Sequence, residues 1–260
     1  MNLEIISREP KNVRSRTPLL FVHGSCHAAW CWDENFLPYF ADQGFSSHAV
    51  SLRGHGASEI PENFNWTSAA DYAADVSQAV SQFANAPVLI GHSLGGFVAQ
   101  KFLENHDLPA AILVAPSPVG GMFWSGLKLQ LQHPWLFTKV AFKRDFQMLY
   151  NTPERAKAFL FSPDADDEKV AVYARRFGKE SYRGAMEMIY NLPKPKKIKT
   201  PLLVLGAEND VIIAPREIEK TARAYNADYK IFPNMAHDLM LESRWQTVAD
   251  FMIGWLRKIV

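Results

Sequence analysis

The chain has 260 residues, enough for one large α/β domain or for one domain that carries an insertion. Its 28 Lys and Arg residues nearly balance its 27 Asp and Glu residues, which leaves a formal net charge of +1. This balance argues against nucleic acid or an anionic membrane as a partner, and the densest basic run, residues 194–199, is interpreted as a solvated linker.

The N-terminal residues and the cysteines indicate where the protein works. Residues 1–16 hold no apolar stretch long enough for a signal peptide, and no window of the chain approaches a membrane span. We therefore expect a cytoplasmic protein without a membrane span. Cys26 and Cys31 are too few for a disulfide framework or a metal site, so we expect buried thiols and no bound metal.

Short apolar runs alternate with longer helical patterns along most of the chain. This alternation predicts an α/β fold with a mostly parallel, doubly wound sheet that is flanked by helices. The helical spacing of apolar residues predicts helices at 67–84, 94–105, 215–226 and 242–258. The predicted strands are Leu19–Val22, Ser47–Leu52, Val88–Ile90, Ala111–Ala115, Leu202–Leu205 and Tyr229–Phe232.

The segment 116–199 interrupts this alternation. It is rich in large apolar residues and shows helical patterns without good strands, at 125–133, 153–161, 166–178 and 179–190. We interpret it as an inserted helical cap on a core formed by residues 1–115 and 200–260. With so many large apolar side chains, part of its surface is expected to cover a pocket.

Residues 88–96 read VLIGHSLGG and contain the pattern Gly-x-Ser-x-Gly between a predicted strand and a predicted helix. A nucleophile on such a tight turn needs neighbours without side chains, which Gly91 and Gly95 provide. Ser93 is therefore the predicted nucleophile. The turn also directs the N–H of Leu94 toward a developing oxyanion.

A second donor to the oxyanion is expected from the loop after the strand at 19–22. There the chain reads His23-Gly24-Ser25, and Gly24 lets the backbone approach a bound carbonyl group. The N–H of Ser25 is the preferred donor, and that of Cys26 is the alternative. His23 is expected to fix the loop by hydrogen bonds to the backbone.

A serine nucleophile needs a base, and the base needs a carboxylate that holds its tautomer. Of the eight histidines, His237 alone follows the last predicted strand in a loop before the final helix. Asp210 ends the loop after the strand at 202–205 and is the preferred carboxylate, with Glu208 as the fallback. Asp238 is poorly placed to reach the ring of its own neighbour.

Together these residues resemble the α/β-hydrolase superfamily, over roughly 18–115 and 200–260. The run HGSCHAAWCW at 23–32 is most similar to the plant methylesterase and hydroxynitrile lyase branch, whereas SLRGHGAS at 51–58 resembles esterases, lipases and C–C hydrolases. The resemblance implies a cofactor-free acyl-enzyme mechanism, oxyanion donors at Ser25 and Leu94, and a cap formed by 116–199.

Three residues separate the chain from neighbouring activities of that superfamily. Hydroxynitrile lyases of the plant branch carry threonine where this chain has Gly24, and lysine where it has Asp238, which disfavours a lyase. Haloalkane dehalogenases and epoxide hydrolases use an aspartate nucleophile, which the serine at position 93 excludes by resemblance.

The sequence thus predicts a cofactor-independent serine hydrolase of an apolar carboxylic ester, lactone or thioester, with a small molecule as its partner. One alternative is a C–C bond hydrolase or perhydrolase that uses the same triad. A second alternative is a ligand-binding protein on a hydrolase scaffold with little turnover. The side chains expected to contact the apolar part of the substrate are Trp30, Phe97, Phe123 and Trp124.

Overall fold

The computed structural model describes all residues from 1 to 260, and its centre is a seven-stranded sheet in the order β1-β3-β2-β4-β5-β6-β7. Only β1 is antiparallel to its neighbour; every other pair is parallel. This confirms the mostly parallel α/β fold. The strands are β1 (Ile5–Arg8), β2 (Leu19–Val22), β3 (Ser47–Val50), β4 (Val88–His92), β5 (Ala111–Val114), β6 (Leu202–Ala207) and β7 (Asp228–Phe232).

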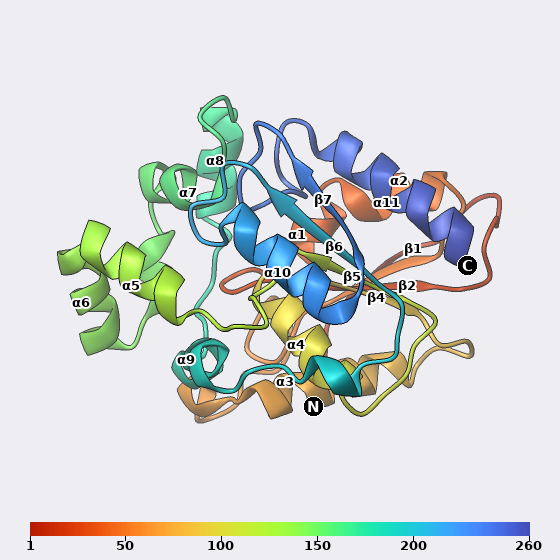
Figure 1. Ribbon diagram of the computed structural model, residues 1–260, viewed down its shortest axis with the longest axis horizontal. Helices are drawn as coiled ribbons and strands as arrows, with labels where there is room; N and C mark the ends of the chain where they lie inside the picture. Colours follow the sequence, from red (N-terminus) through yellow and green to blue (C-terminus); the bar gives the residue numbers. More distant parts are fainter.

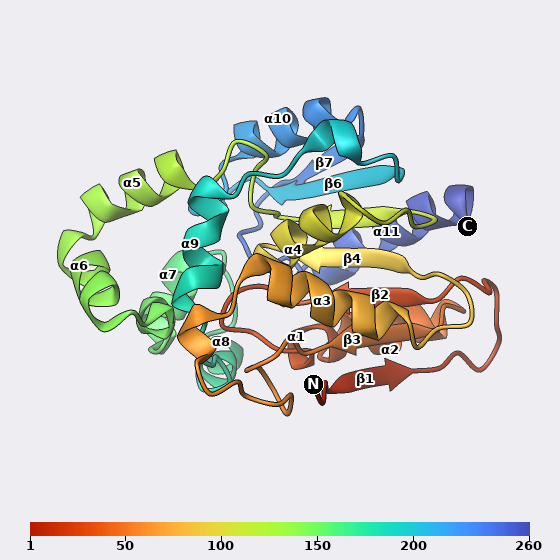
Figure 2. The same ribbon diagram turned by 90° about the horizontal axis from the view of Figure 1, so that it is seen from below.

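Helices cover both faces of the sheet, as expected for a doubly wound fold. Figures 1 and 2 show α3, α4 and α10 on one face, and α1, α2 and α11 on the other. The central strands β2, β4, β5 and β6 are buried along their whole length, because helices pack on each side of them. The helices are α1 (Trp30–Asp33), α2 (Phe36–Asp42), α3 (Ala69–Val80), α4 (Leu94–Leu103), α10 (Pro215–Tyr225) and α11 (Trp245–Ile259).

The chain between β5 and β6 contains helices and no strand. In Figure 2 the parallel strands β4 and β6 point toward this helical segment (residues 116–199), and α5 and α6 project farthest from the sheet. The carboxyl ends of the strands therefore face these helices. They are α5 (Phe123–Gln132), α6 (Pro134–Lys143), α7 (Pro153–Leu160), α8 (Asp167–Ala174) and α9 (Tyr182–Tyr190), with 3₁₀ turns at Phe146–Leu149 and Pro195–Lys197. A further 3₁₀ turn, Phe64–Trp66, precedes α3.

The structure adds elements that the sequence patterns did not predict. The edge strand β1 is only partly buried, so it lacks the continuous apolar run that marked the central strands. The short helices α1 and α2 carry apolar residues on most of their length and follow the loop after β2. The helix α6 begins at Pro134, and only His133 separates it from the end of α5 at Gln132. Proline is favourable at the first position of a helix.

One apolar core joins the sheet to the helices on both of its faces. Its cluster of 67 buried residues includes side chains from every strand except β1 and reaches into α7 and α8 of the helical segment. Local signals fix the helices around this core: Ser68 and Asp71 form a reciprocal capping box at the start of α3. None of the helices combines the length and the apolar character that crossing a membrane requires.

Candidate active site

Ser93 lies on the sharp turn between β4 and α4, where the sequence placed the nucleophile. Its backbone has φ of 52° and ψ of −114°, a positive φ that non-glycine residues rarely adopt. The N–H of Ser93 donates to the carbonyl oxygen of Val114 at 3.0 Å and holds the strained turn against β5. A side chain at Gly95 would collide with the carbonyl groups of Val22 and His23, so the turn packs this tightly only with glycine.

Three predicted residues from distant parts of the chain form a hydrogen-bonded chain at this turn. Nε2 of His237 lies 3.0 Å from Oγ of Ser93, and Nδ1 of His237 lies 2.7 Å from Oδ2 of Asp210. His237 and Asp210 are buried, whereas Ser93 is partly accessible. This is the geometry of a nucleophile, its base and the carboxylate that orients the base.

Asp210 is fixed by the loop that follows β6. Its second oxygen, Oδ1, accepts hydrogen bonds from the N–H groups of Ile212 and Ile213, each at 2.8 Å. The fallback carboxylate, Glu208, lies elsewhere, because it accepts a hydrogen bond from the N–H of Asn234 at an exposed position. The structure therefore brings the preferred carboxylate, and not the fallback, to the base.

The surroundings of His237 favour its protonated form. Burial alone would lower the pKa of His237, but the charge and hydrogen bond of Asp210 raise the pKa above its ordinary value, with a further contribution from Asp238. An imidazole with a raised pKa is a stronger acceptor for the proton of a serine hydroxyl. The same carboxylates stabilise the imidazolium after the transfer.

Two backbone N–H groups near Ser93 are free to bind a negatively charged oxygen. Leu94 is the first residue of α4, so its N–H has no partner within the helix. The N–H of Ser25 donates to no acceptor in the protein, whereas that of Cys26 donates to Oε2 of Glu180 at 3.3 Å. The structure therefore leaves Ser25, and not Cys26, available beside Leu94.

Gly24 lets the loop that carries Ser25 approach the turn at Ser93. A Cβ atom at Gly24 would lie 2.6 Å from Nδ1 of His92 and 3.1 Å from Cβ of Ser93. Neither neighbour can retreat, because His92 is the last residue of the buried strand β4 and Ser93 lies on the strained turn that follows it. His23 holds the loop from the other side: its Nδ1 donates to the carbonyl oxygen of Gly24, and its Nε2 accepts from the N–H of Leu52.

Glu180, which the sequence analysis did not single out, ties the helical segment to the loop that carries Ser25. Besides the N–H of Cys26, its carboxylate accepts the hydroxyl of Tyr72 and the N–H of Ser181, each at 2.7 Å. Nε2 of His55 lies 3.3 Å away; burial opposes the charge of His55, but Glu180 raises its pKa above the ordinary value. One buried carboxylate thus holds four partners.

His27 and Asp238 form a hydrogen-bonded pair beside the catalytic groups that the sequence also did not reveal. The ring nitrogens of His27 contact the carbonyl oxygen of Ser25 at 2.8 Å and Oδ2 of Asp238 at 2.9 Å. Burial would raise the pKa of Asp238, but the charge and hydrogen bond of His27 lower it below its ordinary value. His27 thereby links the loop of Ser25 to the loop of His237. The run HGSCHAAWCW contained this signal, but nothing in the sequence identified its partner.

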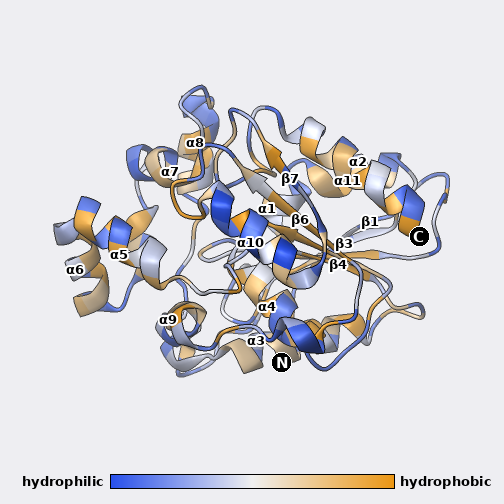
Figure 3. Ribbon diagram, viewed as in Figure 1, coloured by the Kyte–Doolittle hydropathy of each residue, from blue (hydrophilic) through white to orange (hydrophobic).

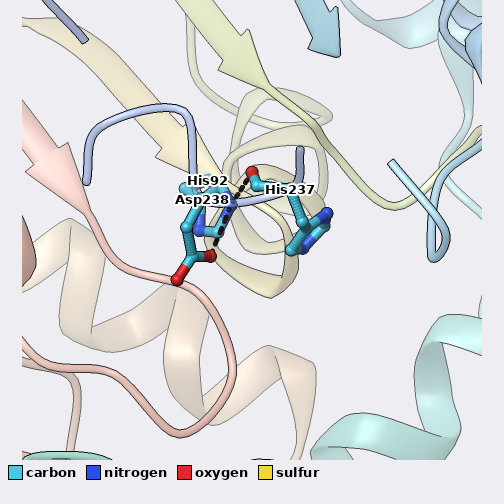
Figure 4. Close-up of side chains that lie close together, drawn as sticks. All are labelled: His92, His237 and Asp238. Atoms are coloured by element: carbon cyan, nitrogen blue, oxygen red, sulfur yellow. Dashed lines mark hydrogen bonds and ion pairs between the residues drawn. The ribbon is translucent and has the colours of Figure 1, made fainter. Parts of the chain in front are cut away.

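His92, His237 and Asp238 lie close enough together to resemble a metal site (Figure 4). Both ring nitrogens of His237 are already engaged, by Asp210 and Ser93. Nε2 of His92 donates to the carbonyl oxygen of His237 at 3.1 Å, and burial lowers the pKa of His92 to about 3. Since neither ring nitrogen of His237 is left for a metal ion, the group supports the base instead of presenting a set of metal ligands.

A cavity of about 350 Å³ extends from Ser93 beneath the helical segment. Polar side chains gather at the end near Ser93, where Ser25, His27 and Ser117 line it together with His92 and His237. The rest of the wall is almost entirely apolar, and no Lys, Arg, Asp or Glu side chain lines the cavity. The apolar wall is formed mainly by Met122, Phe137, Val140, Phe146, Met186 and Ile189.

Only one of the four predicted substrate contacts lies on this wall. Phe123 lines the cavity, whereas the other three do not. Trp30 packs between His27 and Tyr173, and Phe97 is buried on α4. Trp124 points to solvent. The expectation for Trp30, Phe97 and Trp124 is thus corrected, because aromatic residue type alone does not show which way a side chain points.

The chain is similar to several known proteins. Over 273 residues the chain is 23% identical to Epoxide hydrolase 3 of Mus musculus, covering 93% of this chain and 71% of that protein. It is 30% identical over 129 residues to the pFDCC methylesterase MES16 of Arabidopsis thaliana, covering 46% and 48% of the two chains. An esterase structure from Thermogutta terrifontis superposes with a TM-score of 0.75 at 19% identity, covering 99% of this chain and 93% of that one.

The family model described as "Alpha/beta hydrolase family" matches residues 19–251, a range that includes the turn at Ser93 and both loops that carry Asp210 and His237. With nearly the whole chain matched and the fold shared, the protein belongs to the alpha/beta hydrolase family.

Proposed function

We propose that the protein is a serine hydrolase that cleaves neutral carboxylic esters with an apolar acyl group, without a cofactor. One observation carries this proposal. The hydrogen-bonded chain of Ser93, His237 and Asp210 opens onto an apolar cavity that no charged side chain lines.

In the first half of the reaction, Oγ of Ser93 attacks the carbonyl carbon of the ester while Nε2 of His237 takes the hydroxyl proton. The carbonyl oxygen becomes an oxyanion that accepts hydrogen bonds from the N–H groups of Ser25 and Leu94. When the C–O bond to the leaving group breaks, the imidazolium returns its proton to the departing alcohol. The product of this half is an acyl ester on Ser93.

In the second half, water replaces the alcohol. His237 takes a proton from the water, whose oxygen attacks the acyl carbon, and the same N–H groups bind the second oxyanion. Breakdown of this intermediate releases the carboxylic acid and returns the proton to Oγ of Ser93. Asp210 stays ionised throughout and holds Nδ1–H of His237 in place.

The cavity wall supports the choice of substrate. An anionic group inside it would lose its hydration without gaining a cationic partner, which is costly in an apolar environment. A neutral acyl chain loses only contacts with water and is stabilised in proportion to the apolar area that it buries. Lactones and thioesters present the same electrophilic carbonyl group. The likeness to a methylesterase and an esterase is consistent with ester cleavage.

The test is hydrolysis of p-nitrophenyl esters of increasing acyl length by the wild type and by Ser93→Ala. The substitution should lower kcat by about 10⁶-fold, the size of loss found when a hydrolase loses its serine nucleophile. Ser117→Ala is the matched control, because Ser117 also borders the cavity but contacts no base.

Ester hydrolysis that survives Ser93→Ala would refute the assignment of the nucleophile. Saturable binding of these esters without product release, in the wild type, would instead support the ligand-binding alternative. Activity confined to carbon–carbon bond cleavage or to peracid formation would show that the same three residues catalyse that reaction instead of ester hydrolysis.

A further inference from the structure

The most exposed large apolar side chains of the whole protein lie on α5 and α6. They are Phe142, Trp135, Leu131 and Trp124, with exposed fractions of 89%, 81%, 74% and 73%. Figure 2 shows both helices projecting from the rest of the molecule, and Figure 3 shows hydrophobic colour on them at the edge of the protein. Apolar exposure that is concentrated in this way marks a surface that binds something.

Each of the two helices presents the same pattern on its outer side. On α5, Trp124, Lys128 and Leu131 follow one another at intervals of four and three residues. Trp135, Lys139 and Phe142 repeat that spacing on α6. Residues at this spacing share one face of a helix, so these six residues form what we call the α5–α6 surface.

The charged residues on α5 and α6 have one sign. Lys128, Lys139, Lys143 and Arg144 are all exposed, and none of them takes part in an ion pair. No Asp or Glu occurs between residues 108 and 144. The near-zero net charge of the chain therefore hides a local cationic region, because the balancing carboxylates lie elsewhere.

The apolar exposure continues into the cavity that begins at Ser93. Phe123 and Leu127, on the same helix as Trp124, are exposed and also line the cavity. On α6, Phe137 and Val140 line the cavity, and Phe142 faces outward. Helices α5 and α6 thus separate the cavity from solvent by the thickness of one helix. Both helices carry apolar side chains on the cavity side and on the solvent side.

We propose that the α5–α6 surface docks the protein on an anionic lipid surface, with its aromatic side chains in the interfacial layer. Tryptophan and phenylalanine favour the boundary between headgroups and acyl chains, and the lysines reach anionic headgroups from the same faces. The docking does not depend on catalysis. The purpose of docking would be to let an ester dissolved in the lipid pass Phe123 and Leu127 into the cavity. This purpose rests on the proposed hydrolase function.

A second copy of the chain fits this surface less well. A symmetric dimer would place the patch against itself and oppose four cations with four cations, without a carboxylate to separate them. Anionic headgroups supply the complementary charge, and each basic residue near such a surface strengthens binding by roughly fivefold.

The test measures sedimentation of the protein with phosphatidylcholine vesicles that contain or lack phosphatidylglycerol. It uses the Ser93→Ala protein, so that vesicle binding is scored without any ester turnover. We expect binding to the anionic vesicles that weakens with added salt, and much weaker binding to phosphatidylcholine alone.

Trp135→Ser combined with Phe142→Ser should weaken binding to the anionic vesicles by roughly tenfold for each side chain. Lys128→Gln combined with Lys139→Gln should weaken it by roughly fivefold for each charge.

Trp66→Ser is the matched control, because Trp66 is 62% exposed on a 3₁₀ turn outside the α5–α6 surface. In the wild-type background, Trp135→Ser with Phe142→Ser should leave hydrolysis of a water-soluble ester unchanged. Neither side chain lines the cavity, and this activity shows that the variant is folded.

Absence of vesicle binding, or an equal loss of vesicle binding with Trp66→Ser, would overturn the proposal. So would a dimer in solution that the same double substitution dissociates, which would identify a second copy as the partner.

Discussion

The two ends of the cavity are built in opposite ways. At the Ser93 end, buried polar groups make short hydrogen bonds that fix each side chain, as between His237 and Asp210 at 2.7 Å. At the far end, α5, α6 and α9 contribute apolar side chains that make no directional bonds. A chemical step requires groups held within a narrow range of distance and angle, whereas recognition of an acyl chain requires only apolar area. Substitution of the hydrogen-bonded groups at the first end should therefore lower activity, whereas substitution at the second end should change selectivity.

After the loss of Ser93 itself, the largest effect is expected at the carboxylate that orients the base. In Asp210→Asn an amide replaces the oxygen that accepts Nδ1–H of His237, so the ring is no longer held in the tautomer that accepts the proton of Ser93. Ester turnover should fall by up to ~10⁴-fold. Steady-state kinetics check this, with circular dichroism as the control for folding. A loss smaller than tenfold would mean that Asp210 does not orient the base.

A smaller effect is expected at Glu180, which joins the two ends. Glu180→Gln puts an amide NH₂ group against two of the four partners, either Cys26 and His55 or Tyr72 and Ser181, and loosens the loop of Ser25. We expect kcat to fall by ~10- to 100-fold with KM nearly unchanged, below the ~100- to 1,000-fold loss of a whole oxyanion donor.

The control for Glu180 is Glu187→Gln. Glu187 is also buried and ties α9 to the start of α3, by accepting the N–H of Ala69, but it does not touch the loop of Ser25. Equal losses of kcat in the two variants would show that both act only through the packing of the helical segment.

At the apolar end, substitutions should change which ester is preferred. Ala141 lines the cavity and is partly open to solvent, so Ala141→Phe can fill space there without a collision in the core. The ratio of kcat/KM between a long and a short acyl ester should fall by roughly tenfold, the size of effect that a few atoms have in an apolar pocket. Thr138→Phe, on the outer side of the same helix, should leave the ratio unchanged. A uniform loss of activity toward both esters would contradict the division between the two ends.

The smallest effect concerns pH. His237 accepts a proton only when it is neutral, and its pKa is raised above the ordinary 6.5, so activity should fall as the pH drops through that raised value. The acidic limb of kcat/KM should therefore lie above pH 6.5. Asp238→Asn removes a carboxylate that raises the pKa of His237, and it should move this limb to lower pH. A limb that stays in place would exclude any electrostatic role of Asp238.

The polar end could be predicted from the sequence and the apolar end could not. The strained turn at Ser93 and the loops of Asp210 and His237 each follow a buried strand, and the ends of parallel strands meet at one edge of a sheet. Residue type and position therefore determine what lies at that edge. The expectation that the N–H of Ser25 is the second donor rests on Gly24 in the same way.

The side chains that surround these groups depend on contacts between distant segments. Glu180 gave no signal in the sequence, because its partners at positions 26, 55 and 72 meet it only when the helical segment folds onto the core. Trp30 and Phe97 pack away from the cavity, and Trp124 faces solvent, although all three are aromatic residues of the expected kind. The direction of a side chain on a helix depends on how that helix packs. A periodic pattern does not specify this packing when apolar residues occur on several faces of the helix.

The most direct test of the account is to trap the acyl group on the protein. Mixing the wild type with a p-nitrophenyl ester and quenching in acid within the first turnover should yield a chain heavier by the acyl group. Mass spectrometry of the digest should place that group on the peptide with Ser93, and Asp210→Asn should slow its formation and its decay. Release of labelled acid without any acylated peptide, or an acyl group on another residue, would contradict the account.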